Sequence, residues 1–231
     1  MPIQLYDLAG ADPKRRFSPN CWRVTMALAH KGLAFETIPW RFTDKPAIAF
    51  SGQGNVPLII DGDAVVPDSW EIARHLEAAY PDRPSLFGGP AGHALSQFIA
   101  NWTDTVVHPG VARLILLDIH DMLAEVDKAY FRSSREARYG RSLEAVVADR
   151  DVQVIEFRKS LSPLRRTLDR QPFIAGEHPA FADYIVFGAF QWARTASTFA
   201  VLTPDDPVSH WRDRLLDAFD GLARATPSRG E

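Results

Sequence analysis

In the N-terminal third of the chain, short alternating segments flank a helical repeat of apolar positions. Residues 3–7 and 35–40 alternate apolar and polar side chains, which predicts two strands. Between them, apolar residues recur every three or four positions over 19–31, which predicts an amphipathic helix. Because parallel strands need a crossover connection of this kind, the three segments predict a βαβ unit.

Two more short strands and a second helix follow. Residues 58–61 and 64–67 are apolar runs, and the Asp-Gly dipeptide that joins them is a strong signal for a two-residue hairpin turn. Asp68 stands three residues before Glu71, which is the spacing of a capping box with Asp in the capping role. A helix is therefore expected to begin at this point.

The pattern changes over residues 81–90. Three prolines and a Gly-Gly pair interrupt it there, and strand signals nearly vanish afterwards. The segment 181–193 is apolar nearly all round, so we expect it to be the buried core helix of the second half. Other helical segments are expected over 93–123 with a kink at Pro109, within the charged stretch 128–150, along the stripe at 161–168, and over 210–223.

This shift from mixed α/β to all-α patterning predicts two domains. Residues 1–82 form the first domain in this interpretation, 83–90 the linker, and 91–231 the second domain. A chain of 231 residues can bury a substantial core in either half.

Composition excludes several classes of function. Apolar residues make up 46% and charged residues 24%, and the net charge of −3 gives no basic excess for nucleic acid or an acidic membrane. No apolar run approaches the roughly 20 residues of a membrane-spanning helix, and the N-terminus lacks a signal-peptide pattern. The single cysteine, Cys21, fits a reducing compartment, so a cytoplasmic location is expected. No metal-binding spacing is present, and we expect no metal.

The start of the first predicted helix is the main candidate for chemistry. Pro19 suits the first helical position, which places Ser18 at the N-cap. The free N–H groups and the helix dipole at this end stabilise a thiolate or a carboxylate. On these residues alone, an ordinary capped helix explains the pattern at least as well.

Considered together, the motifs resemble the glutathione transferases. The resemblance covers nearly the whole chain and implies a thioredoxin-like N-terminal domain followed by an all-helical C-terminal domain. Val56-Pro57 is similar to the family's cis-proline turn, which pairs with the cysteinyl part of glutathione, and Asn55 precedes it where several classes place a polar side chain. Asp68-Ser69 is similar to the acidic-Ser pair that holds the γ-glutamyl group.

The resemblance also implies a reaction. Ser18 would donate a hydrogen bond to the sulfur of glutathione, the co-substrate, and Asn20 would add a second contact. The thiolate would then attack a hydrophobic aromatic electrophile, in detoxification or aromatic compound catabolism, and a homodimer is expected. The segments 18–23, 29–33 and 130–136 most resemble the etherase-related branch of bacterial β-aryl etherases and fungal etherase-like transferases, which implies cleavage of β-aryl ethers.

Two alternatives remain open from the residues. The chain could bind glutathione and hydrophobic ligands without catalysis, or it could be a thiol transferase or isomerase that uses Cys21. Cys21 shares an apolar helix face, so an inert buried thiol is the simpler interpretation.

Other side chains are weaker candidates. Trp102, His108 and Trp192 are candidates for an aromatic pocket, although core packing explains such residues equally well. Arg41 and Lys45 are candidates for a glutathione carboxylate, with solvated loop charges as the default. Asp183 follows Ala180 where the family has a capping Ser or Thr, and its carboxylate is expected to be buried and bonded to backbone N–H groups.

Overall fold

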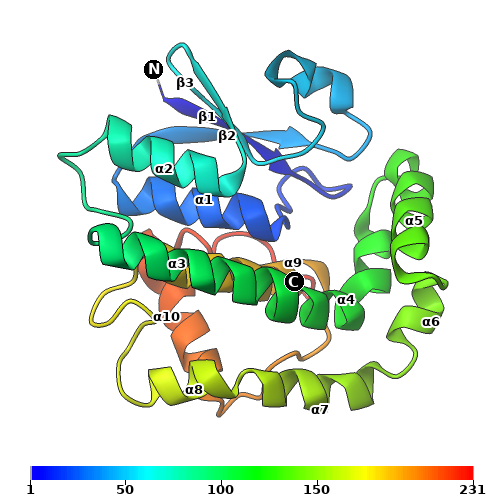
Figure 1. Cartoon of the computed structure of the whole chain (residues 1–231). Coiled ribbons are helices and arrows are strands. Elements are labelled where there is room, and N and C mark those ends of the chain that lie inside the picture. Colours follow the sequence, from blue (N-terminus) through cyan, green and yellow to red (C-terminus); the bar gives the residue numbers. More distant parts are fainter. Residues whose placement is uncertain (1, 231) are drawn as a thin grey trace.

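A four-stranded sheet in the order β2-β1-β3-β4 forms the N-terminal half of the protein (Figure 1). The structure is a computed structural model, and it describes residues 2–230. Strand β1 (Ile3–Leu8) pairs in parallel with β2 (Phe35–Trp40) and antiparallel with β3 (Leu58–Asp61), which pairs antiparallel with β4 (Ala64–Pro67). The predicted βαβ unit and hairpin are both confirmed.

Two helices cover the face of this sheet that is turned toward the second half. Helices α1 (Pro19–His30) and α2 (Ser69–Ala79) lie between the sheet and the C-terminal helices (Figure 1). Helix α1 is buried over most of its length, because two of its faces are apolar and each has a partner. The segment between β2 and β3 carries the short 3₁₀ helix η1 (Lys45–Ser51), which the sequence did not predict.

Helix α2 begins as predicted, but only one of the two reciprocal hydrogen bonds of a capping box is formed. The Asp68 carboxylate accepts hydrogen bonds from the backbone N–H groups of Trp70 (2.8 Å) and Glu71 (3.2 Å). The Glu71 carboxylate pairs instead with Arg74. The reciprocal bond of a capping box is absent because the backbone N–H of Asp68 donates to the carbonyl of Pro57, at 3.2 Å. The predicted capping box is therefore wrong in its second half.

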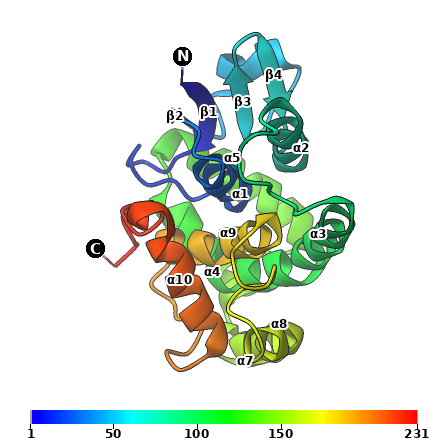
Figure 2. The ribbon, with the colours of Figure 1, turned by 90° about the vertical axis from the view of Figure 1, so that its left-hand side faces the viewer.

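The C-terminal half is all-helical around a central helix, α9 (Phe181–Ala196), which is buried on nearly every side as predicted (Figure 2). The helices around it are α3 (Pro90–Trp102), α4 (His108–Met122), α5 (Glu125–Tyr139), α6 (Leu143–Val147), α7 (Arg150–Ser160), α8 (Ser162–Leu168) and α10 (Pro207–Gly221). None of the helices within residues 2–230 is both long enough and apolar enough to cross a membrane.

The expected helix over 93–123 is helical from Pro90 to Met122, but it changes type shortly before Pro109. A π-helical turn, η2 (Thr103–Val107), separates α3 from α4. Pro109 lies in the first turn of α4, directly after this π-helical turn, and a proline or a π-helical turn is where a helix commonly kinks. The last expected helix is also interrupted, because residues 218–220 depart from helical geometry within α10.

The two halves share one packed interface along α1 and α9. Gly188 of α9 lies against the backbone of Pro19, and a Cβ atom at this position would come within 2.2 Å of the Pro19 carbonyl oxygen. At the other end of α1, a ring nitrogen of His30 lies 2.7 Å from the hydroxyl of Tyr184. This close contact holds the N-terminus of α1, and therefore Ser18, in a set position against the helical half.

The base of α9 is held by one buried carboxylate. Asp183 is fully buried and accepts hydrogen bonds from the backbone N–H groups of Ile174, Ala175 and Ala180, and from the indole N–H of Trp211. These bonds confirm the expectation that its charge is satisfied locally.

Candidate active site

Ser18 caps helix α1 at the edge of a pocket between the sheet half and the helical half. Its Oγ accepts a hydrogen bond from the backbone N–H of Cys21 at 3.2 Å, and the residue is 5% exposed. A hydroxyl that accepts one hydrogen bond through its oxygen still has its own O–H to donate. The cap geometry therefore leaves Ser18 able to donate to an anion at the positive end of the helix dipole.

Residues of the sheet half form one wall of the pocket. The Val56-Pro57 peptide bond is cis, as the resemblance implied, and both residues line the pocket together with Asn55. Asp68 also lines it, with a φ of 68° that the sequence did not predict. Because its Oδ1 takes both capping bonds, Oδ2 remains for a ligand. Ser69 is buried beside Asp68 at the first position of α2, but it does not line the pocket.

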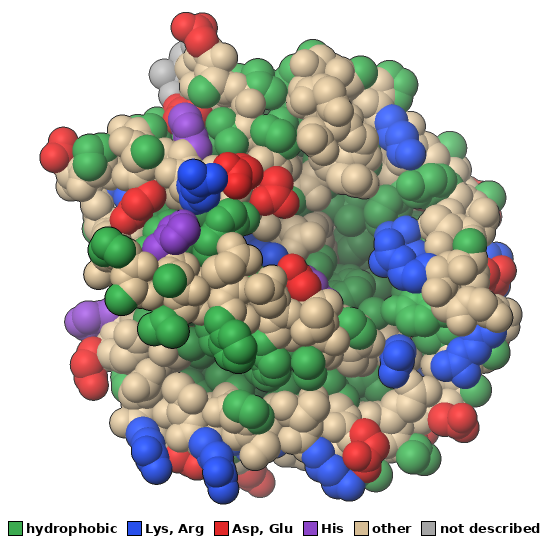
Figure 3. Space-filling view, viewed as in Figure 1, with side chains coloured by type: hydrophobic (Ala, Val, Ile, Leu, Met, Phe, Trp, Pro, Cys, Tyr) green, Lys and Arg blue, Asp and Glu red, His purple; other side chains and the backbone are tan. Residues whose placement is uncertain are grey.

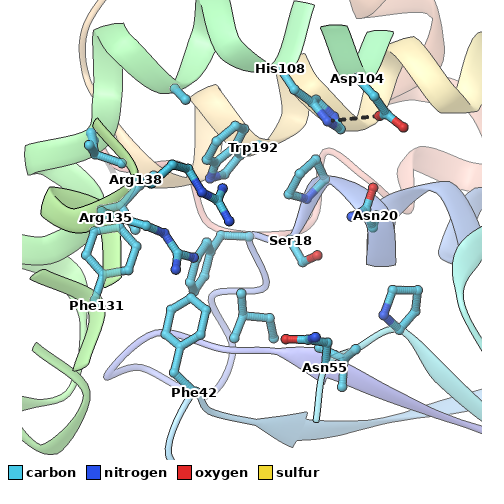
Figure 4. Close-up of a pocket in the computed structure, with 18 of the residues that line it drawn as sticks. Ser18, Asn20, Phe42, Asn55, Asp104, His108, Phe131, Arg135, Arg138 and Trp192 are labelled. Atoms are coloured by element: carbon cyan, nitrogen blue, oxygen red, sulfur yellow. Dashed lines mark ion pairs between the residues drawn. The ribbon is translucent and has the colours of Figure 1, made fainter. Parts of the chain in front are cut away.

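The helical half forms the opposite wall, which is aromatic and basic. Phe131, Arg135 and Arg138 of α5 face Trp192 of α9 across a cavity of about 710 Å³, and Phe42 closes the side nearest the sheet (Figure 4). A volume of this size is typical of a small-molecule site. Figure 3 shows the same hollow lined by hydrophobic side chains, with basic side chains along its α5 side.

An ion-pair network joins the two walls near Ser18. Arg23 of α1 donates to the Asp104 carboxylate at 2.7 Å, and Nδ1 of His108 lies 3.2 Å from the same oxygen. Burial, together with the charge of Arg23, lowers the pKa of His108. Although partial burial opposes it, hydrogen bonds from His108 and Arg23 bring the pKa of Asp104 to about 2. His108 is therefore neutral at neutral pH and Asp104 ionised.

Two buried polar atoms of residues that line the pocket have no hydrogen-bond partner within residues 2–230. They are Oδ1 of Asn20 and Nε2 of His108, and both residues line the pocket. With Nδ1–H directed at Asp104, Nε2 of His108 is an acceptor. Figure 4 shows the Asn20 and His108 side chains on the side of the pocket where Ser18 lies.

Cys21 lies outside the pocket, on a buried face of α1 near strand β1. It is fully buried, and its Sγ is 4.0 Å from the carbonyl oxygen of Tyr6. Burial, and then the neighbouring Asp7 carboxyl, raises the pKa of the Cys21 thiol well above its ordinary value. A thiolate is the reactive form of cysteine, so this environment keeps Cys21 unreactive.

Family comparisons agree with this architecture in both halves. The N-terminal domain of glutathione S-transferases matches residues 14–84, and the C-terminal domain of the same family matches residues 94–206. The chain belongs to the glutathione S-transferase family.

Individual members of the family are similar over nearly the whole chain. The glutathione S-transferase-like protein ustS of Aspergillus flavus is 25% identical, covering 97% of this chain and 88% of its own. The crystal structure of glutathione transferase GSTFuA3 from Phanerochaete chrysosporium superimposes with a TM-score of 0.83 at 22% identity, covering 93% of this chain and 96% of that one. The glutathione complex of CsGST63524 from Ceriporiopsis subvermispora has a TM-score of 0.79 at 23% identity, covering 98% and 99%.

In this glutathione S-transferase family member, the structure brings most of the expected site residues to one pocket. Of the weaker candidates, His108 and Trp192 line it, whereas Trp102 packs against the hydrophobic core. Arg41 pairs with Asp44, and Lys45 lies over the ring of Tyr130, and neither lines the pocket.

Sequence reasoning missed the basic side of the pocket. Arg135 and Arg138 were not among the expected residues, because a charged stretch on a helix usually faces solvent. Two aromatic residues of the pocket, Phe131 on α5 and Phe42 on the side nearest the sheet, were missed as well. The only available signal was the spacing of Phe131, Arg135 and Arg138 on α5, four and then three residues apart.

Proposed function

We propose that this protein is a glutathione transferase of serine type, in which Ser18 holds the glutathione thiolate. The observation that supports it most directly is the Ser18 hydroxyl, which is engaged as an acceptor by the N–H of Cys21 and so is free to donate outward at a helix N-terminus. The family membership of both halves supports glutathione as the co-substrate. So does the glutathione complex of the fungal structure with the same fold.

The sheet wall supplies groups that suit the rest of the tripeptide. The backbone of Val56, before the cis-proline, is proposed to pair with the cysteinyl part, and the Asn55 amide to contact it from the same loop. The free Oδ2 of Asp68 and the neighbouring Ser69 are proposed to hold the γ-glutamyl group. Asn20, one turn into α1, gives a second polar contact near the sulfur.

The chemistry needs only the thiol and a good leaving group. A free thiol has a pKa of about 8.5, and a depression of two units requires about 2.7 kcal/mol. A charge-assisted hydrogen bond and the helix terminus supply this amount together. The sulfur electron pair then forms a C–S bond with the electrophilic carbon, and the pair of the broken bond leaves with the displaced group. The thiol proton passes to solvent.

Cleavage of a β-aryl ether is the specific reaction we propose to test first. Its leaving group is a phenolate. Because the corresponding phenol has a pKa of about 10, the phenolate can leave without strong acid assistance. The aromatic wall formed by Phe42, Phe131 and Trp192 suits an aryl substrate. The resemblance of the segments 18–23 and 130–136 to the etherase-related branch favours this electrophile.

The two alternatives have less support. A thiol transferase that uses Cys21 needs an accessible thiolate, and Cys21 is fully buried with a raised pKa. A binder without catalysis would need no donor at the sulfur, so the free hydroxyl of Ser18 argues against it.

Replacing Ser18 by Ala tests the proposal, with Ser142→Ala as a matched control. Ser142 caps α6 through the same kind of bond, to the N–H of Ala145 at 3.2 Å, but lies outside the pocket. Both variants should lose about 1 kcal/mol of stability through the lost cap. Only Ser18→Ala should return the bound thiol pKa toward about 8.5 and lower turnover about tenfold or more at pH 6.5.

The readouts are the ultraviolet absorbance of the bound thiolate against pH, and turnover of 1-chloro-2,4-dinitrobenzene and of a β-aryl ether. An unchanged thiol pKa in Ser18→Ala would remove the proposed role of Ser18. Binding of glutathione with no turnover of any electrophile would establish the binder instead.

A further inference from the structure

Two arginines of α5 point into the electrophile side of the pocket. Arg135 and Arg138 are three residues apart, so they share one helix face. Figure 4 shows both guanidinium groups directed from α5 toward the pocket, in the region between Phe131, Phe42 and Trp192. The Arg135 guanidinium lies 4.7 Å from the ring centre of Phe131 and 5.3 Å from that of Phe42.

Neither guanidinium has a carboxylate partner within residues 2–230. The one hydrogen bond that Arg135 makes there is to the hydroxyl of Ser134, at 2.9 Å. The neighbouring Arg132 shows the contrast, because it pairs with both Glu136 and Glu144. Burial, and then the charge of Arg138, lowers the pKa of Arg135. Arg135 is half-buried and Arg138 is exposed, and an anion bound between two neighbouring cations reduces their mutual repulsion.

The two acidic side chains that line the pocket pair with neither arginine. Asp104 is matched by Arg23 at 2.7 Å, and Asp68 caps α2 on the opposite wall. The excess positive charge is therefore confined to the α5 side, next to the aromatic rings. A planar carboxylate is the group that a guanidinium binds best, through two parallel hydrogen bonds.

We propose that the electrophile is an aromatic molecule that carries a carboxylate, which Arg135 and Arg138 bind while the ring lies against Phe42 and Phe131. The assignment of this ligand as the electrophile rests on the proposed function. The binding of an aromatic carboxylate by the arginines does not, so the two can fail separately.

The first experiment measures binding alone, by isothermal titration calorimetry with 1-naphthoate and its neutral counterpart 1-naphthamide. Arg135→Gln and Arg138→Gln remove the charges, and Arg141→Gln removes a charge just beyond α5 that does not line the pocket. The two pocket variants should weaken 1-naphthoate binding about tenfold or more, because charged hydrogen bonds are lost. They should leave 1-naphthamide nearly unchanged, and Arg141→Gln should change neither.

The second experiment measures turnover with glutathione and a matched pair of electrophiles, 4-chloro-3,5-dinitrobenzoate and its amide. In the pocket variants, kcat/KM should fall about tenfold or more for the benzoate and stay nearly constant for the amide. The KM for glutathione should not change.

Three results would overturn the proposal. Equal losses for the acid and the amide would mean that the arginines only shape the pocket. A raised KM for glutathione would mean that they bind a carboxylate of the tripeptide. Equal affinity of the unaltered protein for 1-naphthoate and 1-naphthamide would remove the carboxylate site altogether. If neither electrophile turns over while the naphthoate preference holds, the proposed function fails and the anion site stands.

Discussion

At the level of single residues, the carboxyl of Asp7 is a buried polar group whose hydrogen bonding is incomplete. It is 3% exposed at the end of β1, and its Oδ1 has no hydrogen-bond partner within residues 2–230. Burial raises the pKa of Asp7 to about 6, although the charge of Arg16 opposes it. The thiol of Cys21 is the other titratable group beside it. The folded chain therefore keeps Asp7 protonated up to a higher pH than the unfolded chain does.

This environment predicts a pH-dependent effect of Asp7→Asn. The folded chain binds the Asp7 proton more tightly than the unfolded chain, for which 3.8 is the ordinary pKa. The resulting stability is present below that value and is lost as pH rises through about 6. Asparagine stays neutral at every pH, so the variant should gain on the order of 3 kcal/mol relative to the unaltered protein between pH 4 and pH 7.

Urea unfolding at pH 4, 5, 6 and 7 measures this difference. Asp63→Asn, in the exposed hairpin turn, is the control and should show little pH-dependent difference. A constant difference between Asp7→Asn and the unaltered protein across the series would show that Asp7 is ionised throughout.

At the level of elements, the position of Ser18 depends on how closely α1 and α9 approach. Gly188 makes this approach possible, because a Cβ atom there would lie 2.2 Å from the carbonyl oxygen of Pro19. Real contacts of this kind are never so short, so either α9 or the N-terminus of α1 has to shift when a side chain is added. The shift acts directly on the residue that follows Ser18.

Gly188→Ala should therefore harm both stability and the site. Alanine is better than glycine in a helix by about 1 kcal/mol. The clash is with backbone, which cannot swing aside, so overpacking of about 1–3 kcal/mol should outweigh that gain. Turnover with glutathione should fall further than the loss of folded protein explains, since Ser18 is displaced. Urea unfolding and turnover at a temperature well below the transition measure the two effects.

Gly230→Ala serves as the control for this change. A Cβ atom at Gly230 would lie 3.9 Å from the Thr198 side chain, which is an ordinary van der Waals contact. The substitution should therefore change both measurements little. If Gly188→Ala leaves the unfolding free energy and the turnover as they are in the control, the close approach does not position the site.

Local signals in the sequence were enough for the sheet half and for the cap at Ser18. The alternation over 3–7 and 35–40, the Asp-Gly turn and the Ser-Pro helix start are all read over a few neighbouring residues. The π-helical turn η2 was missed, because it depends on how α3 and α4 pack against α9. The inward direction of Arg135 was missed for the same reason, since tertiary packing decides which face of α5 meets the pocket.

At the level of the whole molecule, the pocket is divided between the two halves by chemistry. The sheet half contributes polar groups that suit a peptide, whereas the helical half contributes aromatic rings and the two arginines (Figure 4). Each half alone would leave its wall open to solvent. The contact between α1 and α9 is therefore a requirement of the site as well as of the fold.

One exposed apolar surface of the helical half lies outside the pocket. Leu95 and Phe98 of α3 are each 68% exposed and lie three residues apart on one helix face. Figure 3 shows hydrophobic side chains gathered over α3 on the face in view. Exposed apolar groups of this size are typical of interaction sites. Homodimerisation is expected from the family resemblance, and this face is where we predict the second copy to pack.

Phe98→Glu should therefore convert a dimer into a monomer. A carboxylate at the centre of an apolar interface loses its hydration without gaining a partner, which costs several kcal/mol in each copy. Ile155→Glu on α7 is the matched control, because Ile155 is also exposed, at 51%, but lies on another helix of the second half. Size-exclusion chromatography with light scattering should give a dimer for the unaltered protein and for Ile155→Glu, and a monomer for Phe98→Glu. A monomeric unaltered protein, or a dimeric Phe98→Glu, would show that α3 is not the dimer interface.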